Sequence, residues 1–270
     1  MHREELTDPV GVRFVPEQAT GVGVLVLAGS RGAADEDRAR LLAGHGALGE
    51  SVQWFGGPGQ SPGPWEVPVE LFQDRVRRLA AVCDRVVVVG LSFGAEAALV
   101  TAVRTPEVDA TVAFSPSDVV WAGVTPEGRQ TSHWTEGGTP LPFVPFAEDW
   151  VPDTDPPVYR DLYLVSRRND PAAVEAATIP VEQIPTLVQV VGGQDLVWPA
   201  GLHATAIAER RAAHGLATTT VVDQDAGHRA ILPGEPAARG GVRMQRGGTD
   251  EANARLGAAA WKEIAGLLVS

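Results

Sequence analysis

The sequence predicts an α/β protein with a mainly parallel central sheet that is covered by helices on both faces. Short runs of β-branched residues alternate with longer helical patterns along the chain. The first such run, Val22–Leu27, is apolar throughout, as expected of a strand buried on both faces. A chain of 270 residues can bury a large core, and one α/β domain of this size is common. We therefore expect a single domain over residues 1–270.

The individual elements follow from periodicity and residue type. Residues 85–89 include four consecutive valines, and residues 93–103 are rich in alanine. Residues 69–82 place apolar side chains at the spacing of one buried helix face. The expected strands are 22–27, 51–55, 85–89, 109–114, 186–190 and 218–222. The expected helices are 35–42, 69–82, 93–103, 200–214 and 252–268.

Between about residues 115 and 183 the regular pattern is lost, and tryptophans and prolines become frequent. A structureless loop of that length is uncommon in a compact domain unless it is functional. We interpret the segment as an irregular cap insertion over the sheet, with local helices that the pattern does not place.

Composition excludes several classes of function. The net charge of −12 disfavours nucleic acids and anionic membranes as partners. No apolar run approaches the length of about 18 residues that a membrane span needs, so we expect a cytosolic protein. The single cysteine, Cys83, rules out an intramolecular disulfide and a cysteine-rich metal site. The single lysine, Lys262, argues against P-loop and Schiff-base chemistry, and we expect neither a metal nor a cofactor.

The pattern Gly-x-Ser-x-Gly occurs twice. At residues 59–63 it lies in a loop rich in glycine and proline, which indicates turn chemistry. At residues 90–94 it lies between the run of valines and the alanine-rich helix. A strand, a sharp turn carrying serine, and a helix form the nucleophile elbow of the α/β-hydrolase fold. We therefore predict this fold, with Ser92 as the nucleophile.

A serine nucleophile needs a base, and the base needs a carboxylate that orients it. In this fold both follow the serine, in the order acid and then histidine. His228 lies in a glycine-containing loop after a late strand, and Asp195 follows the preceding strand. The alternatives for the acid are Asp170, Asp223 and Asp225. The last two are close to His228 in sequence and resemble part of a metal site, but no further ligands lie nearby.

The oxyanion of an acyl-transfer reaction needs two backbone N–H donors. We expect Phe93 to provide one, and the turn after the first long strand to provide the other from Ser30 or Arg31. The aromatic residues Trp121, Trp134, Phe143 and Trp198 are equally consistent with core packing and with the lining of an acyl pocket. Residues 44–49 match a dinucleotide-binding fingerprint, but they follow a helix, so a helix C-cap is the better interpretation.

With these residues placed, the chain resembles the catalytic domain of the acyl-CoA thioester hydrolase / bile acid-CoA:amino acid N-acyltransferase family. This family is a dienelactone-hydrolase-like branch of the α/β-hydrolases. The matching segments are 29–32, 66–72, 90–96, 115–117, 193–199, 226–228 and 247–249. The resemblance implies that Ser92, Asp195 and His228 are nucleophile, acid and base. It also implies an acyl thioester substrate, carried by coenzyme A or by a carrier protein.

The chain departs from the family pattern in two ways. Many members carry an N-terminal β-sandwich, and we expect this chain to lack it because only about twenty residues precede the first core strand. The amino acid transferases of the family have cysteine at the elbow, whereas this chain has serine. Water intercepts a serine acyl-enzyme more readily, which favours hydrolysis over transfer. An acyltransferase, a carboxylesterase and a non-catalytic binding protein are the alternatives.

A coenzyme A substrate raises an electrostatic problem because the chain is acidic. Long-range attraction of an anionic ligand is not expected, so any phosphate contacts must come from local arginines. The arginines available for this role are Arg31, Arg129, Arg167, Arg168, Arg239, Arg243 and Arg246.

Overall fold

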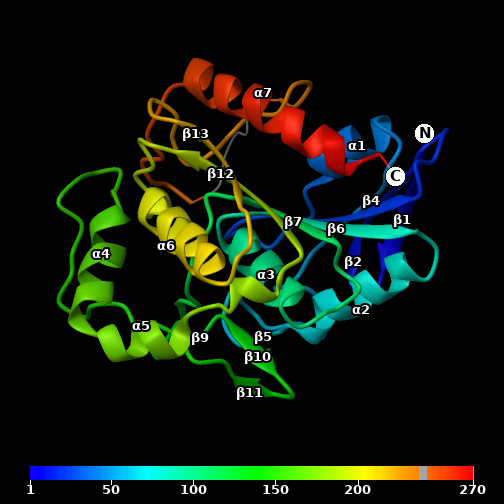
Figure 1. Cartoon of the computed structure of the whole chain (residues 1–270). Coiled ribbons are helices and arrows are strands. Elements are labelled where there is room, and N and C mark those ends of the chain that lie inside the picture. The colour runs from blue at the N-terminus through cyan, green and yellow to red at the C-terminus, as the bar shows by residue number, and fades with distance from the viewer. Residues whose placement is uncertain (237–241, 270) are drawn as a thin grey trace.

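A computed structural model describes residues 1–236 and 242–269. Its centre is an eight-stranded sheet in the order β1-β2-β4-β3-β6-β7-β12-β13 (Figure 1). The strands are β1 (His2–Thr7), β2 (Val10–Val15), β3 (Val22–Leu27), β4 (Leu48–Val52), β6 (Arg85–Leu91), β7 (Ala110–Phe114), β12 (Thr186–Gly192) and β13 (Thr219–Asp223). The strands from β4 to β13 are mutually parallel, whereas β2 is antiparallel to both of its neighbours. The predicted α/β fold is confirmed.

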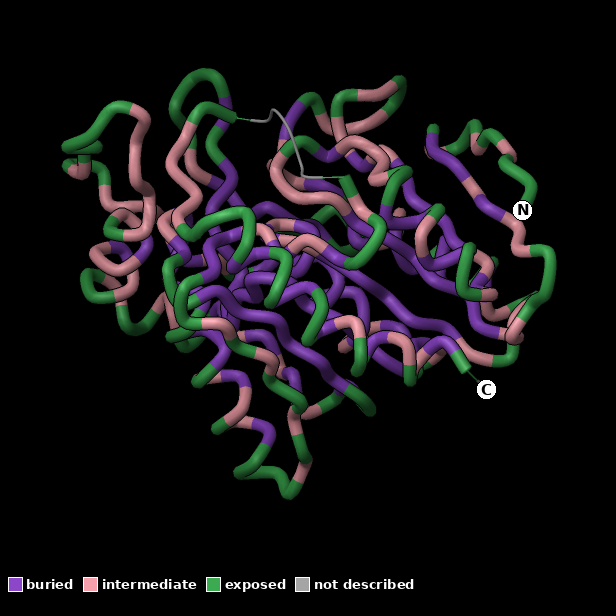
Figure 2. The backbone as a smooth tube through the Cα atoms, turned by 90° about the horizontal axis from the view of Figure 1, so that it is seen from above, coloured by how far each residue is buried: buried purple, intermediate pink, exposed green. Residues whose placement is uncertain are grey.

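Helices cover the two faces of the sheet and enclose two separate apolar cores (Figure 1). One face carries α1 (Glu36–Gly44) and α7 (Asp250–Leu267). The other carries α2 (Glu70–Ala80), α3 (Phe93–Ala102) and α6 (Ala200–Ala213). Strand β6 lies in the middle of the sheet and is buried along almost its whole length. Figure 2 shows that the buried backbone is concentrated in the interior of the molecule. The turn that follows β6 therefore stands on a rigid base.

The N-terminal hairpin β1–β2 was not predicted by the sequence patterns. Strand β1 has the sequence HREELT and lies at the edge of the sheet, where its side chains are mostly exposed. Strand β4 begins three residues earlier than predicted. It contains Glu50, which is fully buried and bonded to Arg13 at 2.7 Å and to Arg75 at 3.0 Å. Because Glu50 forms a buried ion pair, this inner strand contains a charged residue. Its sequence therefore looks polar, which is typical of a loop.

The segment from 115 to 183 forms short elements beside the sheet. They are β8 (Ala122–Val124), β9 (Gln130–Ser132), β10 (Trp134–Glu136), β11 (Thr139–Pro140), α4 (Arg160–Asn169), α5 (Pro171–Ala177) and the 3₁₀ turn at Val181–Gln183. Strand β10 pairs with β5 (Val67–Pro68), outside the large sheet. The segment is packed into the protein, because Trp121, Trp134 and Tyr163 belong to the apolar core on the side of α2, α3 and α6.

A buried charge cluster ties this segment to α6. The carboxylate of Asp118 accepts hydrogen bonds from Arg167 on α4, at 2.8 and 3.1 Å, and contacts Nδ1 of His203 on α6. Burial alone would raise the pKa of Asp118, but the hydrogen bond from His203 and the positive charge of Arg167 outweigh it and hold the pKa below its usual value. A lowered folded-state pKa stabilises the folded protein above the unfolded pKa of about 3.9.

We therefore expect Asp118→Asn to lower the free energy of unfolding at pH 7 by about 3 kcal/mol, because it breaks a buried ion pair. The difference from the unmodified protein should shrink as the pH falls below about 4, because Asp118 then takes up a proton in the unfolded state first, and it should be lost once the pH falls below the lowered folded-state pKa. Denaturant unfolding between pH 7 and pH 3 measures it. Asp161→Asn, an exposed change on α4, is the control. A difference that does not vary with pH would contradict the assignment.

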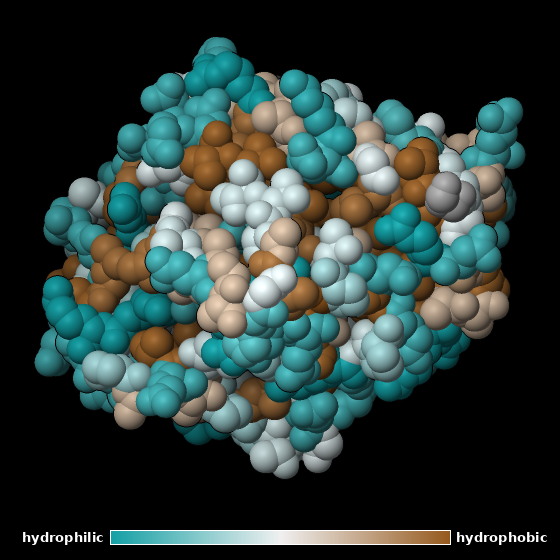
Figure 3. Space-filling view, viewed as in Figure 1, coloured by the Kyte–Doolittle hydropathy of each residue, from teal (hydrophilic) through white to brown (hydrophobic). Residues whose placement is uncertain are grey.

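In the described ranges, no helix combines the length and the apolar character needed to cross a lipid bilayer. Figure 3 shows small groups of hydrophobic residues separated by hydrophilic side chains on the face in view. That face therefore shows no broad apolar surface.

Candidate active site

Ser92 occupies a sharp turn between β6 and α3. Its backbone has φ 59° and ψ −122°, a conformation that L-residues rarely adopt and that is typical of strained functional turns. A Cβ atom at Gly90 would lie 2.0 Å from the carbonyl oxygen of Gly94, and one at Gly94 would lie 2.2 Å from that of Leu27. Both flanking glycines are required because strand, turn and helix approach so closely. The turn has the form that the Gly-x-Ser-x-Gly motif at 90–94 predicts.

Asp195 and His228 form a buried pair. Asp195 lies in the turn after β12, and its Oδ2 accepts a hydrogen bond from Nδ1 of His228 at 2.7 Å. Its other oxygen accepts backbone N–H groups of Val197 at 2.8 Å and Trp198 at 3.2 Å, which fixes the carboxylate. A carboxylate accepts hydrogen bonds, so this contact favours the tautomer of His228 with the proton on Nδ1, which leaves Nε2 as the ring atom that can act as a base.

Backbone and aromatic contacts place this pair at the same end of the central strands as Ser92. The N–H of Ser92 donates to the carbonyl of Phe114 at 2.9 Å. The hydroxyl of Ser115, the residue that follows Phe114, donates to the carbonyl of His228 at 3.0 Å. The Trp198 ring lies 5.8 Å from the Phe93 ring and 5.9 Å from the His228 ring. The nucleophile candidate and the Asp195–His228 pair therefore gather at the carboxyl ends of β6, β7 and β12.

The turn after β3 lies beside Ser92. Residues 29–32 form a tight turn in which Gly32 N–H donates to the Gly29 carbonyl at 2.9 Å. A Cβ atom at Gly29 would lie 4.0 Å from Oγ of Ser92. Phe93 is the first residue of α3, and N–H groups at a helix start have no partner within the helix. Phe93 and the turn that contains Ser30 and Arg31 therefore both lie next to Ser92, and the N–H groups of these three residues are the candidate oxyanion donors.

The four aromatic residues expected as core or pocket have different positions. Trp134 packs against Trp54 at 5.3 Å in the core between α2 and the sheet. Trp121 stacks on Phe146 at 5.8 Å, and Phe143 is half-buried against the same core. Trp198 is fully buried and contacts both Phe93 and His228. Of the four, Trp198 is the one placed directly against the candidate triad.

Three buried polar residues near the site were not found from the sequence. Glu96, one turn after Ser92 on α3, accepts hydrogen bonds from Nε1 of Trp134 at 2.7 Å and from Nδ1 of His133 at 3.0 Å. The His133 ring lies 4.1 Å from that of Phe93. Burial, with the negative charges of Glu96 and Asp195, raises the pKa of Tyr163 well above its usual value, so its phenol stays neutral. One feature of the sequence pointed to this cluster: Glu96 is the only acidic residue in an otherwise apolar helix.

The motifs set aside in the sequence have structural roles. Ser61, in the second Gly-x-Ser-x-Gly pattern, lies in an irregular loop and donates to the carbonyl of Glu66 at 3.1 Å. Gly46, in the fingerprint-like stretch, has φ 95° just after α1, as expected for a helix C-terminus. Asp223 and Asp225 contact Arg255 at 3.1 and 3.3 Å. Within residues 1–236 and 242–269, no group of three side chains could hold a metal ion.

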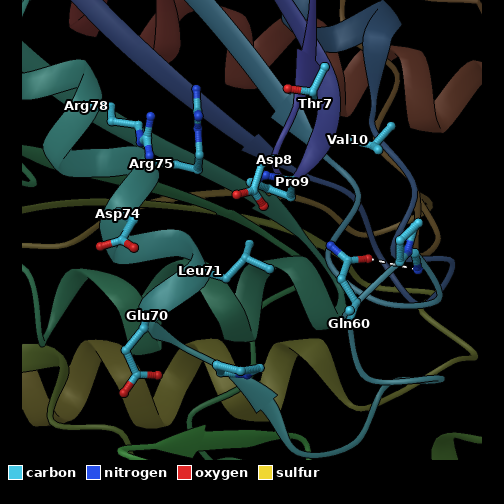
Figure 4. A pocket seen from close by; sticks show the side chains of 14 residues that line it. Thr7, Asp8, Pro9, Val10, Gln60, Glu70, Leu71, Asp74, Arg75 and Arg78 are labelled. Atoms are coloured by element: carbon cyan, nitrogen blue, oxygen red, sulfur yellow. Dashed lines mark hydrogen bonds between the residues drawn. The ribbon is translucent and has the colours of Figure 1, made fainter.

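A cleft of about 410 Å³ lies between the β1–β2 turn, the loop at 57–60 and α2 (Figure 4). It contains neither Ser92 nor the Asp195–His228 pair. Charges of both signs line it: Asp8, Glu70, Asp74, Arg75 and Arg78. Arg75 is already committed to Glu50. Because both acidic and basic residues line the cleft, it favours neither an anionic nor a cationic substrate. We do not assign the reaction to this cleft.

The central sheet, the covering helices and the strained serine turn define a protein of the α/β-hydrolase fold. The family described as BAAT / Acyl-CoA thioester hydrolase C terminal matches residues 67–268, and the chain belongs to this family. The resemblance predicted from its motifs is confirmed, and the chain is a hydrolase-type enzyme.

Solved structures support the fold. A Klebsiella pneumoniae protein described as a dienelactone hydrolase is similar, with a TM-score of 0.55 and 11% identity over 99% of this chain and 98% of that one. Esterase B of Lactobacillus rhamnosis has a TM-score of 0.50 and 15% identity over 82% and 74%. A Thermogutta terrifontis esterase has a TM-score of 0.50 and 16% identity over 81% and 78%. No curated protein matches the chain in sequence.

Proposed function

We propose that the chain hydrolyses acyl thioesters through an acyl-enzyme on Ser92. The observation that carries the proposal is the 2.7 Å hydrogen bond between Asp195 and His228, held at the sheet edge where the strained turn presents Ser92. A hydroxyl in a sharp turn, an imidazole and a buried carboxylate are the three groups of a catalytic triad. The imidazole takes the proton of the hydroxyl, and the carboxylate stabilises the imidazolium that forms. Membership of the thioester hydrolase family supports a thioester as the bond that is cleaved.

In the first half-reaction, Nε2 of His228 removes the proton of Ser92, and Oγ attacks the carbonyl carbon of the substrate. Asp195 stabilises the imidazolium that forms. The oxyanion of the tetrahedral intermediate accepts hydrogen bonds from the N–H of Phe93 and from the N–H of Ser30 or Arg31. One such donor contributes about 3 kcal/mol to the transition state. The C–S bond then breaks, leaving the acyl group on Ser92. A thiolate leaves easily, so the C–S bond can break before the sulfur is protonated; His228 then gives its proton to the departing thiolate, which returns the imidazole to its neutral form.

In the second half-reaction, His228 removes a proton from water, and the resulting hydroxide attacks the acyl-Ser92 carbonyl. The bond between the acyl carbon and Oγ breaks, and His228 returns the proton to Ser92. The products are a free carboxylic acid and the free thiol. Atoms and protons balance over the cycle without a metal or a cofactor.

Serine as the nucleophile is also what favours water over an amine or alcohol acceptor. The only thiol, Cys83, is not an alternative nucleophile because it precedes β6, at the opposite end of that strand from Ser92. Burial, together with the nearby negative charges of Glu50 and Asp84, raises the pKa of the Cys83 thiol, which disfavours its reactive thiolate.

Paired substrates and product analysis test the proposal. The same acyl group is offered as a thioester and as an oxygen ester, with and without glycine, taurine or an alcohol as acceptor. We expect free acid as the product in every case and a higher kcat/KM for the thioester. Conjugates instead of free acid would indicate an acyltransferase, and a preference for the oxygen ester would indicate a carboxylesterase. Binding without turnover would indicate a non-catalytic protein and overturn the proposal.

A further inference from the structure

Most of the arginines considered for a substrate phosphate are held by other groups of the protein. The pairs are Arg129 with Glu66, Arg167 with Asp118, Arg243 with Asp155, and Arg246 with the carbonyls of Val242 and Met244. Arg31 and Arg168 are exposed, and Arg239 lies outside the described residues. We assign no phosphate site to these arginines.

Ser115, a buried residue directly after β7, connects the segments that carry the candidate triad. Its N–H donates to the carbonyl of Val190 in β12 at 2.8 Å. Its carbonyl accepts Nε1 of Trp198 at 3.2 Å, and its hydroxyl donates to the carbonyl of His228 at 3.0 Å. Each polar group of this one residue thus binds a segment that ends at Asp195 or contains His228.

The backbone of Ser115 is strained. In the described part of the chain, three residues other than glycine have a positive φ: Glu66, Ser92 and Ser115, the last with φ 46°. Glycine adopts such a conformation without steric cost, so the backbone alone would favour glycine at position 115. Serine differs from glycine there by its hydroxymethyl group. The strain therefore indicates that the hydroxyl has a role in the site.

The hydroxyl holds the main chain of His228 from one side. On the other side, the N–H of His228 donates to the carbonyl of Arg246 at 2.9 Å. The imidazole itself is held at Nδ1 by Asp195, at 2.7 Å. A single hydrogen bond is a point about which a ring can pivot. The position of Nε2 therefore depends on how firmly the backbone of His228 is held as well.

The same end of β7 also holds Ser92. The N–H of Ser92 donates to the carbonyl of Phe114, the residue directly before Ser115. Consecutive Cα atoms are only about 3.8 Å apart. Two adjacent residues thus bind the backbones of the candidate nucleophile and the candidate base, so one short stretch of chain sets the spacing between them.

We propose that Ser115 is a positioning residue, whose hydroxyl holds the backbone of His228 at the distance from Ser92 that proton transfer requires. This inference rests on the proposed function, because it takes Ser92 as the nucleophile and His228 as the base. Proton transfer needs the two reacting atoms within about 2.6–3.2 Å of each other. A displacement of about 1 Å can lower the rate about 100-fold. Loss of the hydroxyl should therefore slow the chemical step and leave substrate binding unchanged.

Two substitutions separate this role from a contribution to folding. Ser115→Ala removes the hydroxyl and keeps the backbone strain, whereas Ser115→Gly removes both. We expect both variants to lower kcat for the neutral butyryl thioester of N-acetylcysteamine by about 10- to 100-fold, with KM changed less than about twofold. In thermal unfolding, Ser115→Gly should melt at a higher temperature than Ser115→Ala. Activity that followed this order of stability, with Ser115→Gly close to the unmodified enzyme, would overturn the proposal.

The matched control is Ser117→Ala, two residues further along the same segment. Ser117 is also buried, but its hydroxyl donates to the carbonyl of Val119 at 2.7 Å and accepts Nε1 of Trp121 at 2.9 Å. This variant should be less stable than the unmodified protein and keep its kcat. A loss of kcat as large as that of Ser115→Ala would show a general effect of the segment and overturn the proposal.

Labelling of Ser92 by a fluorophosphonate tests the same role without a thioester, because that reaction needs only the nucleophile and its base. We expect the second-order rate constant of labelling to fall in Ser115→Ala by about the same factor as kcat. An unchanged labelling rate in Ser115→Ala would overturn the positioning role and leave the proposed function intact. Absence of label on Ser92 in the unmodified protein would overturn both.

Discussion

Ser92→Ala should lower kcat/KM for acyl thioesters by at least about 10³-fold, because it removes the only atom that forms the acyl-enzyme. The fold should be unaffected. Alanine and serine meet the same backbone strain at φ 59°, and the turn is held by the backbone bond from Ser92 to Phe114. Steady-state kinetics gives the loss in activity, and thermal unfolding gives the stability.

The control is Ser61→Ala, which alters the serine of the second Gly-x-Ser-x-Gly pattern. Ser61 donates to the carbonyl of Glu66 in a loop that is not part of the candidate triad. This variant should keep full activity. If Ser61→Ala lost activity while Ser92→Ala kept it, the nucleophile would be assigned to the wrong motif.

Asp195→Asn is expected to lower kcat by about 10⁴-fold, the loss seen when the acid of such a triad becomes an amide. The amide NH₂ would face Nδ1 of His228, which then has to be the acceptor. Nε2 would carry the proton instead and be unable to remove that of Ser92. The variant should still fold, because the amide oxygen can accept the N–H groups of Val197 and Trp198.

Two neighbouring acids test whether this effect is specific. Asp223 and Asp225 lie closer to His228 in the sequence, but both contact Arg255. Asp223→Asn and Asp225→Asn should each keep most of the activity. A loss of several orders of magnitude in one of these variants, with an active Asp195→Asn protein, would transfer the role of the acid to that residue.

Most of the parallel sheet could be predicted from sequence because its strands are buried on both faces. The strand predicted at 22–27 is found at Val22–Leu27, where every residue is buried, and the helix predicted at 93–103 is found at Phe93–Ala102. The hairpin His2–Val15 escaped prediction because an edge strand needs few apolar residues. The elements between 115 and 183 escaped it because they are short and are held by contacts such as that of Asp118 with Arg167, which no local pattern encodes.

The residues of the candidate site likewise include some that the sequence predicted and some that it did not. Ser92, Asp195 and His228 follow individual strands, so the order of motifs along the chain was enough to select them. Glu96 and His133 are 37 residues apart and meet only through the packing of the segment beside α3.

Mass spectrometry of the covalent intermediate tests the central claim most directly. The enzyme is mixed rapidly with an acyl thioester, quenched in acid and digested, and the peptide that carries the acyl mass is sequenced. We predict one acyl group per chain, attached to Ser92, that disappears in the Ser92→Ala variant and when the substrate is exhausted. An acyl group on another residue, or turnover with no acylated peptide while Ser92→Ala remains active, would contradict the account.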